Sequence, residues 1–354
     1  MQILLPYKDV NIKSRNYTFD FLKAIFALSI ILVHFPFPYP VGPIFSTMGI
    51  CGVIFFFLIS GYSSYNKDDE VASKNILRRF KRNLKILIIV FLIYFVLVIP
   101  LRLVTGEFDY FLNSFKNPWL FPRLFLLGDF SFISGDQLWF MVALLYSYLI
   151  LYVLHKFKVM KYAYYALPIL ILIRVGVETY VNSYDVDWHI SSIFIASGLP
   201  IMMLGSYIAY KKDAFLKSPL ISNIIIFTVS TIMMYVTVYI KAVGFDIAQP
   251  FKIISMLELF LIALKLPGAK EYGFIGKLGR KYSLYIYLFH LLFGLVAYDA
   301  LYLFDFPGWV YDWCGPIVAF VFGTLISIGL YELNNLIKSK MRKKRNQADM
   351  ISLK

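Results

Sequence analysis

About ten stretches of 17–25 mostly apolar residues dominate this sequence of 354 residues. A bilayer core about 30 Å thick needs about 20 apolar residues in an α-helix, so each stretch is long enough to cross it. The composition agrees, since 60% of the residues are hydrophobic and 16% are charged. The sequence therefore predicts an all-α, polytopic integral membrane protein. The expected spans are residues 19–35, 49–64, 84–104, 138–154, 162–181, 191–210, 219–240, 250–266, 282–303 and 313–337.

The distribution of positive charge predicts the orientation of these spans. If the N-terminus is cytoplasmic, 28 of the 35 Lys and Arg residues lie on the inner side, 5 lie on the outer side, and Lys23 and Arg174 lie within spans. This asymmetry follows the positive-inside rule and requires an even number of spans, with both termini in the cytoplasm. The basic segment 338–345 would then contact anionic lipid headgroups. Membrane lipids thus account for the net charge of +14, and nucleic acid is not expected as a partner.

No shift in composition marks a second domain. We expect a single transmembrane domain over 1–337 and a basic cytoplasmic tail over 338–354. The first apolar run lacks a small-x-small cleavage site, which predicts a retained span and not a signal peptide. Walker A, HExxH, paired CxxC and G-x-S-x-G motifs are absent, so no ATP hydrolysis, metal cofactor or serine-hydrolase chemistry is expected. A disulfide between Cys51 and Cys314 is conceivable, although packed free thiols are favoured.

The first span carries three ionisable residues, Asp20, Lys23 and His34. Such a group costs roughly 2.5–3.5 kcal/mol at mid-membrane and usually marks a functional site. At about 100° per residue, Lys23 and His34 share one helix face and lie about 16 Å apart along the axis, and Asp20 is close to the same face. Neutral imidazole suits general-base catalysis near pH 7, so His34 is a candidate base. The alternative is a histidine that hydrogen-bonds between helices as packing.

Further polar residues lie near both predicted membrane surfaces. Arg79 and Arg82 share a helix face in the segment after the second span, where guanidinium groups can bind phosphate or anchor the chain to the membrane. Ser60 and Gly61 end the second span on the inner side, where small residues permit either close helix packing or entry of a narrow ligand. His290 lies about 10 Å deeper than Ser283 on one face of the ninth span, which predicts a polar interior.

Five motifs, in this order, resemble the bacterial acyltransferase 3 family of integral membrane O-acyltransferases. They are Lys23-x10-His34, the Gly52–Tyr62 segment, Arg79-x-x-Arg82, Leu138-Trp139-Phe140 and Ser283…Tyr287-x-x-His290. The resemblance covers about residues 19–337. It implies transfer of an acyl group from cytoplasmic acyl-CoA, often acetyl-CoA, to a hydroxyl of a surface polysaccharide or lipid-linked glycan at the bacterial plasma membrane. Acyl-CoA would be a co-substrate and no cofactor would stay bound.

The resemblance also implies roles for individual residues. His34 would act as catalytic base or as covalent acyl relay. The donor would bind to Lys23, Arg79, Arg82, Ser60 and Gly61. Supporting roles would fall to Asp20, Ser283, Tyr287, His290 and Trp139. Asp20 lies about 20 Å from His34 along the helix, so it would hold Lys23 or an arginine in place and would not orient the imidazole.

Two positions depart from the family pattern. Ile54 stands where many members carry an acid, and Gln137 stands where many carry histidine. Both lie toward the outer side, so the acceptor is the least defined part of the prediction. A transporter or flippase of a glycan or lipid precursor is the main alternative, although no internal repeat supports it. An inactive structural component of a polysaccharide-synthesis complex is a third, and proteins of that pathway are candidate partners.

Overall fold

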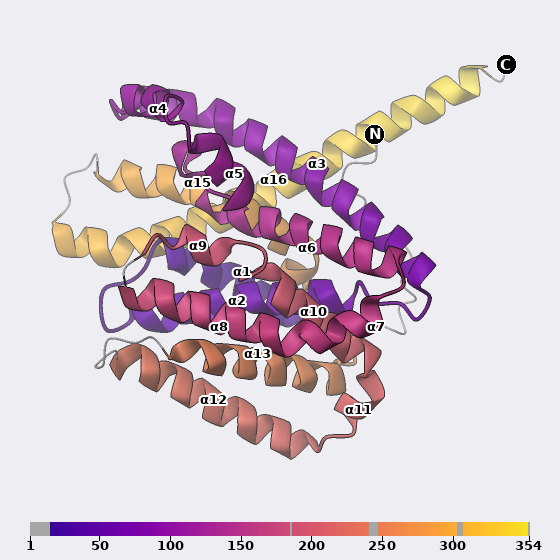
Figure 1. The fold of residues 1–354 in the computed structure, drawn as a ribbon. Helices are drawn as coiled ribbons and strands as arrows, with labels where there is room; N and C mark the ends of the chain where they lie inside the picture. Colours follow the sequence, from indigo (N-terminus) through magenta and orange to yellow (C-terminus); the bar gives the residue numbers. More distant parts are fainter. Residues whose placement is uncertain (1–14, 185, 241–246, 303–306, 353–354) are drawn as a thin grey trace.

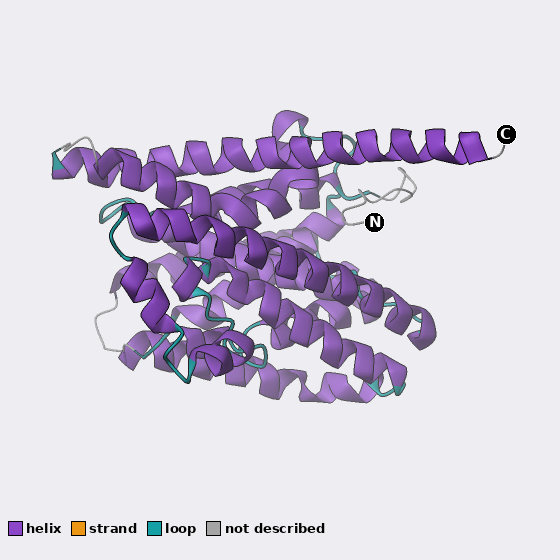
Figure 2. Cartoon of the chain, turned by 90° about the horizontal axis from the view of Figure 1, so that it is seen from above, coloured by secondary structure: helices purple, strands orange, loops and turns teal. Residues whose placement is uncertain are grey.

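The computed structural model describes all residues except 1–14, 185, 241–246, 303–306 and 353–354. Within these described ranges all regular secondary structure is helical (Figure 2). The long helices are α1 (Tyr17–His34), α2 (Gly42–Tyr62), α3 (Asp69–Val104), α6 (Trp139–Lys156), α8 (Leu167–Tyr184), α10 (Gly198–Tyr210), α12 (Leu220–Ile240), α13 (Ala248–Lys265), α15 (Ser283–Tyr302) and α16 (Gly308–Ser352). Short helices connect them: α4 (Phe108–Ser114), α5 (Leu120–Leu126), η2 (Ser131–Ile133), η3 (Asp136–Leu138), α7 (Met160–Ala163), η4 (Tyr164–Ala166), α9 (His189–Ser192), α11 (Lys212–Leu216), α14 (Gly273–Lys277) and the π-helical turn η5 (Leu278–Tyr282).

Each expected span overlaps one of the long helices. Seven segments of the described chain, those that contain α1, α2, α3, α6, α8, α12 and α16, are long and apolar enough to cross a membrane. Of the remaining three, α10 has only 13 residues, and α13 carries Lys252, Glu258 and Lys265. The predicted class, an all-α polytopic membrane protein, is confirmed. The number of spans and the side on which the termini lie stay predictions.

Several helix boundaries differ from the predicted ones. α2 begins at Gly42, before residue 49, and α16 continues through the expected tail to Ser352. α3 begins at Asp69, well before residue 84, because the Asp68 carboxylate accepts hydrogen bonds from the first backbone N–H groups of the helix. The basic residues expected in a loop therefore lie on a helical extension of the span. α10 begins at Gly198, later than residue 191, because residues 189–197 form α9 and a turn.

The long helices lie side by side in a bundle (Figure 1). α1 packs against α2 on one side and against α15 and η5 on the other, while α12 pairs with α13 and α15 pairs with α16. A glycine allows two of these backbones to touch. A Cβ on Gly279 would lie 2.7 Å from the carbonyl carbon of Asp20, so η5 crosses the start of α1 in direct backbone contact.

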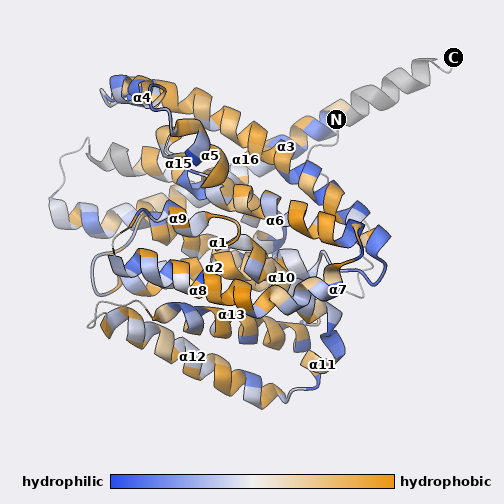
Figure 3. Ribbon diagram, in the orientation of Figure 1, coloured by the Kyte–Doolittle hydropathy of each residue, from blue (hydrophilic) through white to orange (hydrophobic). Residues whose placement is uncertain are grey.

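Polar segments gather at the two ends of the bundle. Figure 3 shows hydrophilic residues on α4 at one end, and on α11 and the start of α3 at the other. Apolar side chains cover the outward faces of the helices between these ends, among them Ile88, Leu92, Ile225 and Val229. This pattern is the reverse of a water-soluble protein and matches a surface in contact with lipid.

Candidate active site

The start of α1 is held in place by polar contacts. The side chain of Asn16 caps the helix by accepting a hydrogen bond from the N–H of Phe19, and its amide donates to the carbonyl of Ala263 in α13. The buried carboxylate of Asp20 forms ion pairs with Arg15 at 2.6 Å and with Lys23 at 3.4 Å. A cluster of two cations and one anion therefore occupies this end of α1.

The other end of α1 brings His34 to a second histidine. The imidazole rings of His34 and His290 lie 5.2 Å apart between centroids, with an angle of 44° between their planes. His290 is fully buried and His34 is half-buried. Two sequence segments that were each predicted to hold a polar residue thus meet at one point.

The protonation of His290 follows from its hydrogen bonds. Its Nδ1 lies 3.0 Å from the carbonyl of Ile286 and 2.9 Å from that of Tyr287. Because carbonyls only accept, Nδ1 is the protonated nitrogen and Nε2 of the neutral ring carries the lone pair. That Nε2 is buried and has no hydrogen-bond partner in the described part of the chain. It is therefore free to accept a proton or a hydrogen bond.

A hydrogen-bonded network lies behind the histidine pair. The hydroxyl of Tyr287 donates to the carbonyl of Gln137. The buried amide of Gln137 donates to the hydroxyl of Tyr94 and, at 2.9 Å, to the carbonyl of Leu288. The Tyr94 hydroxyl also donates to that carbonyl at 2.9 Å. These bonds fix α15 against α3 and η3, and with it the position of His290.

Arg79 and Arg82 project from the extension of α3. Arg79 binds the C-terminal end of α2, where its Nη2 donates to the carbonyl of Ser63 at 2.8 Å and its Nη1 donates to the Ser63 hydroxyl. Arg82 is exposed. The Arg79 guanidinium is thus fixed against the end of α2 that carries Ser60, and that of Arg82 is exposed.

Gly61 has a packing role in this structure. An added Cβ would lie 2.6 Å from the carbonyl carbon and 2.7 Å from the Cα of Met202 in α10. Gly205 of α10 approaches α2 in the same way, since its Cβ would lie 2.9 Å from the nitrogen of Tyr62. The two glycines let α2 and α10 cross in backbone contact. This is the packing alternative that the sequence left open.

The remaining predicted residues differ in their surroundings. Ser283 donates to the carbonyl of Gly279 one turn earlier at 2.8 Å, so its hydroxyl is satisfied within the helix. Trp139 packs near Phe57, with ring centroids 6.5 Å apart. Ile54 is fully buried in the apolar core, and both cysteines are free thiols.

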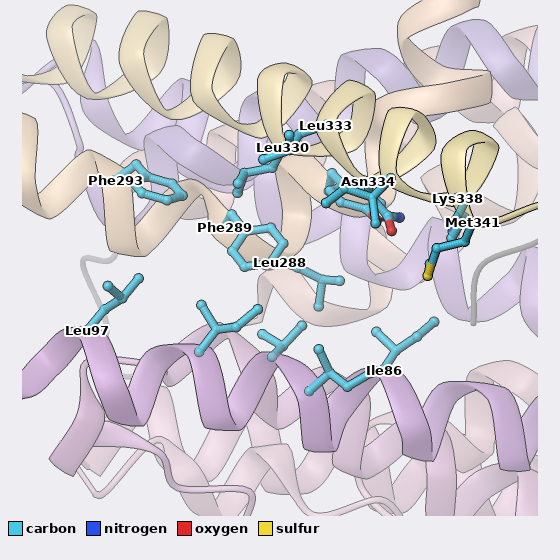
Figure 4. Close-up of a pocket in the computed structure, with 15 residues that line it drawn as sticks. Ile86, Leu97, Leu288, Phe289, Phe293, Leu330, Leu333, Asn334, Lys338 and Met341 are labelled. Carbon is cyan, nitrogen blue, oxygen red and sulfur yellow. Dashed lines mark hydrogen bonds between the residues drawn. The ribbon is translucent and has the colours of Figure 1, made fainter. Parts of the chain in front are cut away.

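An apolar hollow borders α15. It has a volume of about 440 Å³ and separates α3 from α15 and α16 (Figure 4). Leu288 and Phe289 form part of its wall, and Asn334, Lys338 and Met341 lie toward one end. Three further hollows lie elsewhere on the bundle, and neither His34 nor His290 lines any of these four in the described chain. His290 is thus packed among helices, whereas His34 beside it is half-buried.

Comparison with protein families decides the class of this site. The family model of the acyltransferase 3 domain matches residues 16–332, which include the histidine pair, the Asp20 cluster and both arginines. The chain belongs to the acyltransferase 3 family. The predicted family is thereby confirmed, and acyl transfer by a multi-pass membrane protein is the general activity of the domain. No curated protein and no solved structure matches the chain.

Two residues of this acyltransferase site were missed as contributors by sequence reasoning. Gln137 was noted only as a departure from the family pattern, and Tyr94 was not singled out. A tyrosine or glutamine within an apolar span is a weak signal, because its partners lie on other helices. The buried hydrogen bonds to α15 reveal their contribution.

Proposed function

We propose that this acyltransferase transfers an acyl group, acetyl in the first instance, from cytoplasmic acyl-CoA to a hydroxyl of a surface polysaccharide or lipid-linked glycan. Its proposed location is the bacterial plasma membrane. One observation carries the proposal: the two ends of α1 hold different chemistry, with the Asp20 cluster at one end and the histidine pair at the other.

The first end of α1 suits the donor. CoA carries phosphate groups, and Lys23, Arg79 and Arg82 offer cationic groups near the inner ends of α1, α2 and α3. Guanidinium binds phosphate in a bidentate manner, and ammonium acts as a point charge. Asp20 holds Lys23 in place through the ion pair at 3.4 Å. Acyl-CoA is therefore the proposed co-substrate.

The histidine pair suits the transfer step. His34 removes the proton from the acceptor hydroxyl as its oxygen attacks the thioester carbonyl, and a C–O bond forms. The C–S bond then breaks, and the proton passes from His34 to the departing thiolate, which yields an ester and free CoA. His290 contributes a second imidazole 5.2 Å away between ring centroids, whose unprotonated Nε2 can accept a proton.

The burial of the histidine pair bears on this proposal. His290 is fully buried and His34 is half-buried, so we propose that side-chain rotation or separation of neighbouring helices admits the pantetheine arm to His34. The apolar hollow between α3, α15 and α16 offers room for a hydrocarbon chain of a membrane lipid beside the same helix, α15. Exclusion of water would protect the thioester from hydrolysis.

The test is an acyl-transfer assay on membranes that contain the full chain. Labelled acetyl-CoA and longer acyl-CoAs are supplied, and base-labile label is measured in the polysaccharide and lipid fractions. We expect label with the wild type and background label with His34→Ala. His155→Gln is the matched control, since His155 pairs with Asp69 far along the chain from the histidine pair. Equal labelling by wild type and His34→Ala would refute the proposal.

A further inference from the structure

A second polar site lies in the segments that connect the helices at the α4 and α9 end. It combines Arg123 of α5, Asp129 and Asp136 from the stretch before α6, and Asp187 and His189 from the turn after α8. We call these five residues the loop cluster. By the charge asymmetry of the sequence, this end faces the outer side.

His189 is oriented by its neighbours. Its Nδ1 lies 2.7 Å from Oδ1 of Asp187, which also accepts the backbone N–H of His189 at 3.0 Å. The ring of Trp188 stacks on the imidazole at 3.9 Å between centroids. Because a carboxylate only accepts, Nδ1 carries the proton, and the more distant Arg123 at 3.5 Å does not change this. The lone pair of the neutral ring is therefore on Nε2.

This Nε2 atom is aimed into the loop cluster without a hydrogen-bond partner. His189 is 6% exposed, and no hydrogen bond to its Nε2 is present within the described ranges. It lies 3.3 Å from Oδ1 of Asp129. Oδ1 of Asp136 is likewise buried and without a partner there. Two acceptor atoms that need a cation or a donor thus face one point.

The spacing of these atoms fits a metal ion. One atom from each of Asp129, Asp136 and His189 can be chosen so that all three lie within 4.8 Å of one another. Two ligands bonded at about 2.0–2.1 Å to a tetrahedral ion lie about 3.3 Å apart. The distance between His189 and Asp129 already has that value. Binding would require the Asp136 carboxylate, which lies within 4.8 Å of the other two ligand atoms, to move toward them.

The charges of the loop cluster also call for a cation. Three carboxylates face one guanidinium, so with neutral His189 the cluster has a net charge of −2 when all three acids are ionised. A divalent ion would neutralise the cluster.

We propose that Asp129, Asp136 and His189 bind a Zn²⁺ ion. Imidazole together with two carboxylates is a donor set that Zn²⁺ accepts, whereas Mg²⁺ and Ca²⁺ prefer oxygen ligands alone. Asp187 is a positioning residue that fixes the tautomer of His189, as carboxylates do for zinc-bound histidines. Arg123 and Ser131 hold Asp129 in place. The ion would clamp the stretch before α6 to the turn after α8, with a fourth coordination position open to water.

This inference is independent of the proposed acyl transfer and is an alternative to the expectation of no metal. That expectation rested on contiguous motifs, and these ligands come from two segments that are distant in sequence. The competing explanation is a protonated His189 that bridges Asp187 and Asp129 as an ion pair. The two explanations differ in whether the chain binds zinc.

The test uses the purified full-length protein in detergent, stripped with chelator and titrated with Zn²⁺ alone. Bound zinc is counted by mass spectrometry of the metal and its affinity is measured by calorimetry. We expect about one tight site per chain, lost in His189→Ala and Asp136→Asn and weakened about 10–100-fold in Asp187→Asn. Asp312→Asn, an exposed acid at the start of α16, is the matched control and should keep the site.

A second readout guards against misfolded variants. Chelator should lower the melting temperature of the wild type and of Asp312→Asn, and should leave that of Asp136→Asn unchanged. A wild type that binds no zinc would overturn the proposal. So would a tight site that survives intact in both His189→Ala and Asp136→Asn.

Discussion

The crossing of α2 and α10 gives a sharp test of the structure, because Gly61 lies where the two backbones touch. In Gly61→Ala the new Cβ would lie 2.6–2.7 Å from backbone carbon atoms of Met202. Carbon atoms in contact prefer about 3.5–4.0 Å, so the helices must separate by about 1 Å. The neighbouring atoms are backbone and cannot rotate away. Overpacking of this kind costs about 1–3 kcal/mol, and we expect the upper part of that range.

A glycine inside another long helix offers a matched control. Gly176 lies in α8, and an added Cβ there would meet nothing within 4 Å. Gly176→Ala should therefore leave stability unchanged or raise it by up to about 1 kcal/mol through helix propensity. Thermal unfolding of both variants in detergent, followed by circular dichroism, measures the difference. We expect a melting temperature several degrees lower for Gly61→Ala only.

One result would refute the packing argument for Gly61. If Gly61→Ala melts with the wild type while its affinity for acyl-CoA falls, Gly61 borders the donor and does not serve the helix crossing. Measuring both quantities on the same preparation separates the two roles.

Three further predictions concern the ends of α1 and the network behind His290. Asp20→Asn removes the carboxylate partner of Lys23 and Arg15, so we expect the free energy of unfolding to fall by about 2 kcal/mol. An unchanged melting temperature in thermal unfolding would contradict the pairing. Arg79→Ala with Arg82→Ala should weaken CoA binding about tenfold or more, since each charged hydrogen bond contributes about 1.5–3 kcal/mol. Lys74→Ala on the same helix is the control, and equal affinity of all variants would count against phosphate binding. Gln137→Leu removes the hydrogen-bond donors to Tyr94 and Leu288, so it should lower the free energy of unfolding by about 1–3 kcal/mol and slow acyl transfer. Wild-type stability and a wild-type transfer rate would show that the network is dispensable.

The sequence was a good guide to the helices and to α1. Hydropathy located each long helix, and helical spacing placed Lys23 and His34 on one face, because both depend only on local periodicity. The start of α3 was placed too late, because the charged residues of its extension lower the hydropathy that marks a span. Asp68 followed by Asp69 and Glu70 was the available start signal, an N-cap with acids in the first turn.

Contacts between distant segments were beyond local reasoning. The meeting of His34 with His290 and the hydrogen bonds of Gln137 depend on how α1, α3 and α15 pack. The choice between packing and ligand entry at Gly61 depends in the same way on its neighbour Met202. The family match establishes the general activity, acyl transfer, whereas the donor, the acceptor and the catalytic base stay proposals.

The most direct test of the proposed chemistry is single-turnover acyl transfer with the donor already bound. Wild type, His34→Ala and His155→Gln are saturated with labelled acetyl-CoA, mixed with acceptor membranes, and both donor affinity and the rate of ester formation are measured. The proposed mechanism predicts donor affinity within about twofold for all three proteins and transfer slowed about 10²–10⁴-fold in His34→Ala alone. Transfer at the wild-type rate in His34→Ala, with donor bound, would contradict it.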